Sequence, residues 1–157
     1  MPDPLSIYVI DTCSFTELRR AYPRPAFEAV WRLIERLVAD GRLISVEDVL
    51  VELSVQDDEV TEWARLHSHI FQPLTPQIQL KGRDILAAYP KLLDLKKKKS
   101  SADPFVIAAA IVANATVVTQ EKPSGGPPAV KIPDVCAHLA VPCINLLKLL
   151  QAEGLAT

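Results

Sequence analysis

The sequence predicts an α/β fold in which helices cover both faces of a mainly parallel sheet. Short apolar runs rich in β-branched residues recur along the chain, at 7–10, 43–45 and 116–119. Segments with helical spacing of apolar residues separate these runs. Strands that alternate with helices are typical of a parallel sheet buried on both sides.

The N-terminal half supplies two of the strands and several helices. After the strand at 7–10, the stretch 14–43 carries one amphipathic pattern that ends at Gly41, with apolar residues at Phe27, Val30, Trp31, Ile34, Leu37 and Val38. A short strand at 43–45 leads into a helix that continues through Leu53, and another helix is expected from Asp57 or Asp58 to His67. Thr75 and Pro76 predict the N-cap and first residue of a further helix.

The C-terminal half begins with a helix at 100–115 that is apolar on nearly every side, which predicts that it is buried. The strand at 116–119 follows it, and then a loop dense in Pro and Gly. A short helix at 132–141, a strand fragment at 142–145 and a helix that Gly154 ends complete the expected order. No internal repeat is visible.

Size and composition predict one globular domain over residues 1–157. Of the 157 residues, 49% are hydrophobic and 23% are charged, which is ordinary for a folded domain. The net charge of -2 provides no global positive field, so a bound polyanion would have to be held locally. The longest apolar stretch is shorter than the roughly 20 residues that a membrane span requires, so no membrane association is expected. Three cysteines without paired zinc spacing and an acidic N-terminus predict a cytoplasmic protein with free thiols.

Four acidic residues occupy positions that a fold of this class can bring together. Asp11 ends the first strand, and Glu121 follows the strand at 116–119 after one residue. Asp103 stands at the start of the buried helix, and Glu52 lies in a helix whose apolar residues face inward. In open α/β sheets, ligands bind in the crevice beyond the carboxyl ends of the strands. We therefore expect these four side chains to surround one site.

Three of the four acids also have a structural explanation. Asp11 could cap a helix that follows it, Asp103 before Pro104 has the position of an N-cap, and Glu52 could be a solvated helix residue. If the four carboxylates converge, however, each pair at about 4 Å repels by about 4 kcal/mol at an effective dielectric constant near 20. A hard divalent cation, Mg²⁺ or Mn²⁺, would relieve this repulsion. Such a site predicts hydrolysis of phosphodiesters.

The sequences around these acids resemble the motifs of the PIN domain, a nuclease fold typified by the VapC ribonuclease toxins of toxin-antitoxin pairs. "YVIDTCSF" is similar to the opening motif, "VLVEL" to the second and "SADPFVIAAA" to the third. "VVTQE" is similar to the fourth motif, a strand that ends in Thr-x-Asp. The resemblance spans residues 7–121, and the order and spacing of the motifs agree with the family.

The resemblance implies a three-layer α/β/α sandwich with a central, mainly parallel sheet. It also implies that Asp11, Glu52, Asp103 and Glu121 are catalytic and bind Mg²⁺ or Mn²⁺, and that the hydroxyls of Thr12, Ser14 and Thr119 support them. The implied protein is a metal-dependent endoribonuclease, the toxin of a toxin-antitoxin pair, with RNA as substrate, a small antitoxin as partner and a homodimer as its assembly. Two features depart from the family. Glu121 stands where Asp is usual, and the segment after it is longer and richer in Pro and Gly.

Other interpretations remain open at the level of sequence. A catalytically degenerate PIN-like module that acts through a protein partner is the main alternative to the nuclease. A phosphoaspartate enzyme of the haloacid-dehalogenase kind needs a second acid two residues after Asp11, where Cys13 stands, and the acidic pair of a receiver domain is absent. The basic run at 96–99 could hold RNA phosphates or form a solvated loop. Asp134 has the position of a helix-start acid.

Overall fold

Five parallel strands form the centre of the protein in a computed structural model, which describes residues 6–92, 102–125 and 131–155. The strand order is β3-β2-β1-β4-β5. The bounds of the strands are β1 Tyr8–Ile10, β2 Leu43–Val46, β3 Phe71–Gln72, β4 Thr116–Val118 and β5 Cys143–Ile144. Strands β2 and β3 therefore extend the sheet on one side of β1, and strands β4 and β5 extend it on the other side.

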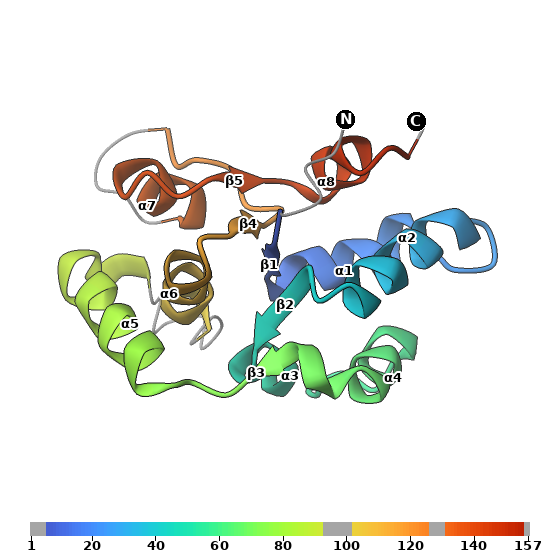
Figure 1. Cartoon of the computed structure of the whole chain (residues 1–157), viewed down its shortest axis with the longest axis horizontal. Coiled ribbons are helices and arrows are strands. Elements are labelled where there is room, and N and C mark those ends of the chain that lie inside the picture. Colours follow the sequence, from blue (N-terminus) through green and yellow to red (C-terminus); the bar gives the residue numbers. More distant parts are fainter. Residues whose placement is uncertain (1–5, 93–101, 126–130, 156–157) are drawn as a thin grey trace.

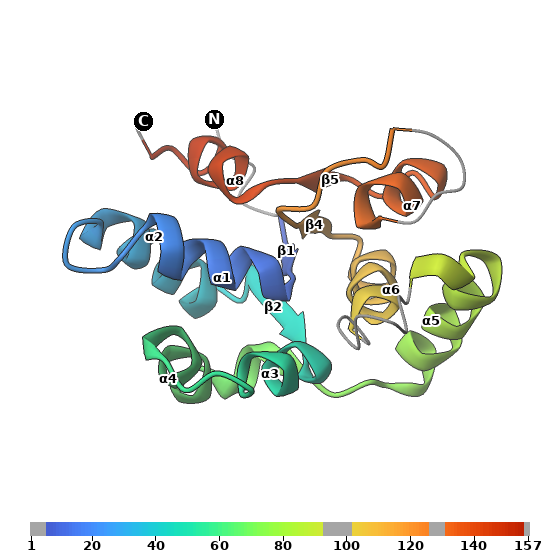
Figure 2. The ribbon, with the colours of Figure 1, turned by 180° about the vertical axis from the view of Figure 1, so that it is seen from behind.

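Helices cover both faces of this sheet, as Figures 1 and 2 show. The helices α5, α6 and α7 lie on one side, and α1, α2 and α8 lie on the other, with α3 and α4 beside α1. The bounds of the helices are α1 Thr12–Ala21, α2 Glu28–Ala39, α3 Glu47–Leu53, α4 Glu59–Leu66, α5 Pro76–Ala88, α6 Asp103–Ala113, α7 Ile132–His138 and α8 Leu146–Ala152. Two 3₁₀ turns, Ser68–Ile70 and Pro90–Leu92, complete the described elements. The predicted α/β/α sandwich on a central parallel sheet is confirmed.

The core is formed by the central strands and the helices that pack on both faces of the sheet. Among these helices, α6 is buried on nearly every side, as predicted. Val106, Ile107 and Ala108 are fully buried. Gly82 allows α5 to approach this helix closely, because a Cβ atom at Gly82 would lie only 2.5 Å from the ring of Phe105 in α6. The helix ends at Asn114 in the left-handed conformation, with φ of 53°.

Two local predictions were wrong. The stretch 14–43 contains two helices, α1 and α2, where one amphipathic helix was expected. Pro23 and Pro25 lie between them, and a proline inside a helix removes a backbone hydrogen bond and clashes with the preceding turn. The strand β3 was not predicted, because its two residues are too few to show periodicity.

Several local predictions are confirmed. Thr75 caps α5 by accepting a hydrogen bond from the Ile78 N–H, and Asp58 caps α4 in the same way. Asp134 accepts a hydrogen bond from the N–H of Lys131 at the start of α7, as a helix-start acid does.

No described helix has the length and apolar character that crossing a bilayer requires. The basic run at 96–99 falls outside the described residues.

Candidate active site

The candidate site lies between β1 and β4, at the point where the strand order changes direction. Strands β2 and β3 follow on one side of β1, and β4 and β5 lie on the other side. Ile10 is in register with Val118, so Asp11 and Thr119 leave the sheet side by side. The N–H of Asp11 donates to the carbonyl of Val118 over 3.1 Å. In parallel α/β sheets the loops after two such strands diverge and leave a crevice, which is the usual position of a ligand.

Asp11 is the most enclosed of the four predicted acids, with 4% of its surface exposed. Its carboxylate accepts hydrogen bonds from the hydroxyl of Thr119 at 2.6 Å, from the backbone N–H of Ser14 at 3.1 Å and from the thiol of Cys13. The bond from Ser14 makes Asp11 the N-cap of α1, so the capping interpretation describes this residue correctly. The cap uses only one of the two carboxylate oxygens. Because Asp11 also lies in a crevice, its carboxylate is in a position to bind a ligand as well.

Burial dominates the titration of Asp11 and raises its pKa from 3.8 to about 6. The hydrogen bonds from Thr119, Cys13 and Ser14 oppose this shift, and the negative charge of Glu121 adds to it. The pKa of the Cys13 thiol is also raised, first by burial and then by the charge of Asp11. At neutral pH, Asp11 is therefore a carboxylate held in a poorly solvating place.

Glu52 connects α3 to two other parts of the site. Its Oε1 accepts a hydrogen bond from the hydroxyl of Thr12 at 2.5 Å, and its Oε2 accepts one from the backbone N–H of Ala102 at 3.2 Å. Thr12 begins α1 and Ala102 precedes α6, so these bonds join segments 40 and 50 residues away in sequence. The alternative interpretation of Glu52 as a solvated helix residue does not describe this half-buried side chain.

Asp103 and Glu121 complete the set. Asp103 is the first residue of α6 and is 8% exposed, whereas the N-cap position belongs to Ala102. Glu121 follows β4 after Thr119 and Gln120, and its Oε2 accepts a hydrogen bond from the N–H of Ile132 at 2.9 Å. Glu121 therefore supports the first turn of α7.

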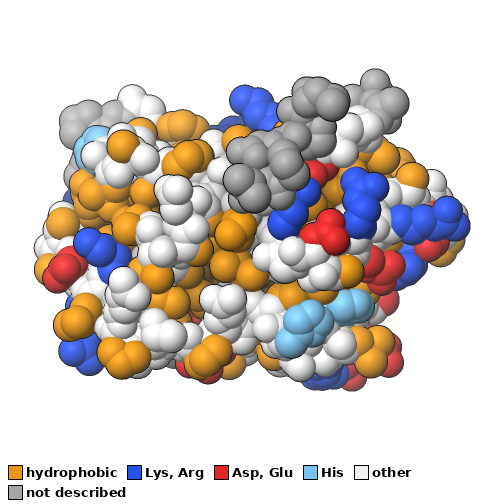
Figure 3. Space-filling model, in the orientation of Figure 1, with side chains coloured by type: hydrophobic (Ala, Val, Ile, Leu, Met, Phe, Trp, Pro, Cys, Tyr) orange, Lys and Arg blue, Asp and Glu red, His pale blue; other side chains and the backbone are white. Residues whose placement is uncertain are grey.

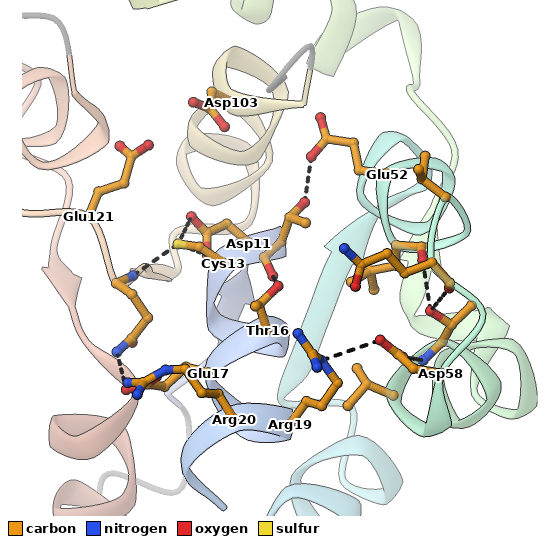
Figure 4. Close-up of a pocket in the computed structure, with 17 residues that line it drawn as sticks. Asp11, Cys13, Thr16, Glu17, Arg19, Arg20, Glu52, Asp58, Asp103 and Glu121 are labelled. Atoms are coloured by element: carbon orange, nitrogen blue, oxygen red, sulfur yellow. Dashed lines mark hydrogen bonds and ion pairs between the residues drawn. The ribbon is translucent and has the colours of Figure 1, made fainter. Parts of the chain in front are cut away.

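All four acids line a single cavity of about 720 Å³. Figure 4 shows Asp103, Glu52 and Glu121 around its upper part, with Asp11 and Cys13 just below them. The four residues come from four separate segments of the chain. The structure thus gathers them around one cavity, as we expected from their positions at strand ends and helix starts.

The donor chemistry of this set fits a hard divalent cation, because carboxylate oxygens are the ligands that Mg²⁺ and Mn²⁺ prefer. Among residues 6–92, 102–125 and 131–155, however, no three His, Cys, Asp or Glu side chains are grouped closely enough to hold a metal ion. Glu52 and Glu121 each direct one oxygen to a backbone N–H instead. The roles of the four acids as metal ligands therefore stay a prediction.

The hydroxyl residues that the resemblance implied occupy positions of two kinds. Thr119 and Thr12 donate directly to Asp11 and Glu52. The hydroxyl of Ser14 instead donates to the carbonyl of Val118, and only its backbone N–H contacts Asp11.

Sequence reasoning missed one wall of the cavity, which α1 provides through Thr16, Glu17, Arg19 and Arg20. The signal was present, because Thr12, Thr16 and Arg20 are spaced four residues apart and share one face of a helix that starts at Asp11. It was not recognised because α1 was not predicted as a separate helix.

Comparison with known proteins gives the chain a family. Residues 8–157 match the profile described as "Domain of unknown function (DUF4411)". The chain belongs to this family. No curated protein matches the sequence significantly. The profile of the DUF4411 family covers all five strands and the whole candidate site.

A solved structure shares the fold of this DUF4411 chain. The crystal structure of PAE2754 from Pyrobaculum aerophilum is similar, with a TM-score of 0.53 and 14% identity over 96% of this chain and 98% of that one. The crystal structure of VapBC2 from Rickettsia felis bound to a DNA fragment from their promoter matches with a TM-score of 0.46 and 13% identity, over 88% of this chain and 98% of that one. The first likeness supports the shared fold and says nothing of activity.

Proposed function

We propose that this DUF4411 protein is a metal-dependent nuclease that hydrolyses phosphodiester bonds of RNA. One observation carries the proposal: four acids from four separate segments line a single cavity at the carboxyl ends of β1 and β4. A protein gains no stability from bringing carboxylates together, since like charges repel and burial disfavours the charged form. A site that binds a cation and a phosphate explains this arrangement.

Each acid has a distinct part in the proposed site. Asp11 and Asp103 are the most buried and would hold the metal, and Glu52 and Glu121 would complete its surroundings. A bound Mg²⁺ or Mn²⁺ polarises a phosphate oxygen and lowers the pKa of a bound water. Thr119, the N–H of Ser14 and Cys13 fix the orientation of Asp11, and Thr12 fixes that of Glu52. These bonds would keep the acids in position before substrate arrives.

The biological role that we propose is that of a toxin held inactive by a small antitoxin protein, with a homodimer as the active assembly. This part rests on the motifs around Asp11, Glu52, Asp103 and Glu121, which resemble those of VapC toxins. Induced expression of the wild-type chain in a bacterial host should stop growth, and Asp11→Asn should not. Growth unaffected by the wild-type protein would remove the toxin role and leave the nuclease in place.

A second candidate is a binding module without catalytic activity. Its support is that Glu52 and Glu121 are engaged by backbone N–H groups, and that the described acids do not form a cluster able to hold a metal. In such a protein the cavity would serve recognition of a protein partner.

A metal titration against fluorescent RNA separates the two candidates. With Mn²⁺ or Mg²⁺ the wild-type protein should cleave, and Asp11→Asn and Asp103→Asn should reduce the rate at least about a hundredfold. The matched control is Asp57→Asn, which removes the same charge from a side chain that is 88% exposed and lies outside the cavity. It should cleave like the wild type.

Thermal unfolding provides a measurement that does not depend on cleavage. An ion that binds only the native state adds about 2.7 kcal/mol to the free energy of unfolding at a hundredfold excess over its dissociation constant. The melting temperature of the wild type and of Asp57→Asn should therefore rise with metal, and that of Asp11→Asn should rise much less. If millimolar ion neither shifts the wild-type melting temperature nor supports cleavage, the binding module is the better description.

A further inference from the structure

The cavity continues away from the four acids to a second end, which carries two arginines and their acidic partners Asp58 and Glu17. Figure 4 shows Arg19, Arg20 and Asp58 in its lower part, on the far side of Asp11 from Asp103. In the view of Figure 3, charged side chains gather over the half of the surface that α1, α2 and α4 occupy, and hydrophobic side chains over the half with α5 and α6. Neither arginine has a part in the site proposed above.

Helix α1 connects the two ends of the cavity and sets the distance between them. Asp11 caps this helix, and Arg19 lies eight residues further along it. With a rise of 1.5 Å per residue, the helix places Arg19 about 12 Å from Asp11 along its axis. A polynucleotide whose reacting phosphate lies beside Asp11 therefore has a neighbouring phosphate to present to the arginines.

Both arginines are held by carboxylates that a phosphate can replace. Arg19 Nε lies 3.3 Å from Asp58 Oδ2, and the two side chains are 37% and 22% exposed. Arg20 pairs with Glu17 at 2.5 Å, and its side chain is 71% exposed. Exposed ion pairs of this kind contribute little to stability, and a guanidinium binds a phosphate with two hydrogen bonds. A phosphate can therefore replace the carboxylate at either arginine with little loss of free energy.

The partner of Arg19 also has a separate task that survives such an exchange. Asp58 Oδ1 accepts a hydrogen bond from the Thr61 N–H at 2.9 Å, which caps α4, whereas the other oxygen faces Arg19. Loss of the ion pair leaves the cap in place.

The lining of the cavity indicates what kind of ligand it recognises. No aromatic side chain is among its described lining residues, so stacking of bases on rings does not contribute. Leu53, Val55 and Val60 provide apolar surface on the side of α3 and α4, and the two arginines together with Glu17 provide charged groups on the side of α1. Recognition would therefore depend on phosphates, with little dependence on base sequence.

We propose that Arg19 and Arg20 form a second phosphate subsite, which selects single-stranded RNA that extends beyond the bond to be cleaved. This inference rests on the proposed function, because the position of the reacting phosphate is taken from the acids. Asp11 and Asp103 are only 4% and 8% exposed, so in this proposal the strand enters the cavity unpaired to reach them. The arginines set its direction along α1.

Salt-dependent binding tests the subsite without any cleavage. Fluorescence anisotropy of a labelled ten-nucleotide single-stranded RNA is measured with EDTA present, over a series of KCl concentrations. For single strands, the slope of log affinity against log salt changes by about 0.7 per phosphate contact. The double variant Arg19→Gln, Arg20→Gln should therefore flatten the slope by about 1.4 and lower affinity at low salt about tenfold.

The matched controls are Arg65→Gln and Arg32→Gln. Arg65 pairs with Asp57, the neighbour of Asp58, and Arg32 lies 3.9 Å from Glu28 within α2. Both removals change the net charge by the same amount outside the cavity, and together they should change the slope by much less than 1.4. The single variant Arg20→Gln, at the more exposed arginine, provides a second test that leaves the pair of Arg19 with Asp58 intact.

The outcomes separate this inference from the proposed function. Equal slopes in the cavity variants and the controls overturn the subsite, even if the wild type cleaves RNA. A flattened slope in a protein that never cleaves shows that the arginines bind phosphates, and it removes the nuclease and the cleaved bond from the proposal. A wild-type protein that does not bind the ten-nucleotide RNA at low salt overturns the subsite.

Discussion

Two buried carboxylates lie at opposite ends of β1, and the protein compensates their charges differently. Glu153, which is 5% exposed, accepts hydrogen bonds from the hydroxyl of Tyr8 and from Arg42, both at 2.6 Å. Asp11, which is 4% exposed, follows the other end of the strand and accepts hydrogen bonds from Thr119, Ser14 and Cys13. Among the described residues, none of the salt bridges includes Asp11.

This difference separates a structural acid from a candidate functional one. A buried ion pair such as Arg42 with Glu153 is complete within the protein, and it joins β2 and the end of α8 to β1. Among the described residues, the carboxylate of Asp11 accepts hydrogen bonds only from uncharged donors, and burial raises its pKa to about 6 although these bonds oppose the rise. Strong perturbation of an acid in a cavity is a feature of functional sites.

Removing each charge without changing the shape of the side chain should give opposite effects on stability. Glu153→Gln breaks the ion pair of the buried Glu153 with Arg42, which should cost about 3–5 kcal/mol in the free energy of unfolding. Asp11→Asn removes a poorly solvated charge and should leave the metal-free protein as stable as the wild type or more stable. Urea denaturation at pH 7 with EDTA measures both. A large loss of stability in Asp11→Asn would make it a structural acid like Glu153.

The free energy of unfolding should depend on pH in the range where the buried carboxylate of Asp11 titrates. Since the pKa of Asp11 is about 6 in the folded protein and near 3.8 when unfolded, the native state binds more protons between these values. Stability from Asp11 is therefore fully present below about pH 4 and is lost as the pH rises through about 6, a change of about 3 kcal/mol.

Denaturation between pH 4 and 7 with EDTA present measures this change, and the difference between wild type and Asp11→Asn isolates it from other groups. Cys13 and Glu121 are the neighbouring titratable groups that act on Asp11, and both remain in the variant. Parallel stability curves for the two proteins would show that Asp11 does not titrate in this range.

A smaller effect is expected from the donor nearest to Asp11. Thr119→Val removes the hydroxyl that lies 2.6 Å from Asp11 Oδ2 and keeps the shape of the side chain. Hydrogen bonds to charged groups contribute about 2 kcal/mol, so stability at pH 7 should fall by about that amount, and the pKa of Asp11 should rise further. Thr119→Ser keeps the hydroxyl and is the control. The midpoint of the pH dependence should move upward only in Thr119→Val, and an unchanged midpoint would remove Thr119 from the support of Asp11.

Local signals in the sequence predicted much of the fold. Thr75 with Pro76, Asp58 and Asp134 mark helix starts that the structure confirms, because a cap acts through bonds within three residues. The apolar composition of α6 predicted its burial, since a helix with no polar face has no surface to present to water. By contrast, the division between α1 and α2 and the strand β3 depended on details that periodicity does not carry.

The sequence by itself determined which acids stand at strand ends and helix starts, and hence that a site could form there. Only the tertiary structure decided how each acid is held: Glu52 by Thr12 and Ala102, Asp11 in a place where burial raises its pKa, and Glu153 against Arg42, a residue 111 positions away. The reason is physical, because capping and periodicity act over a few residues, whereas desolvation and charge pairing depend on everything that packs around a group. The order of the strands brings those distant groups together, and that order is a property of the whole chain.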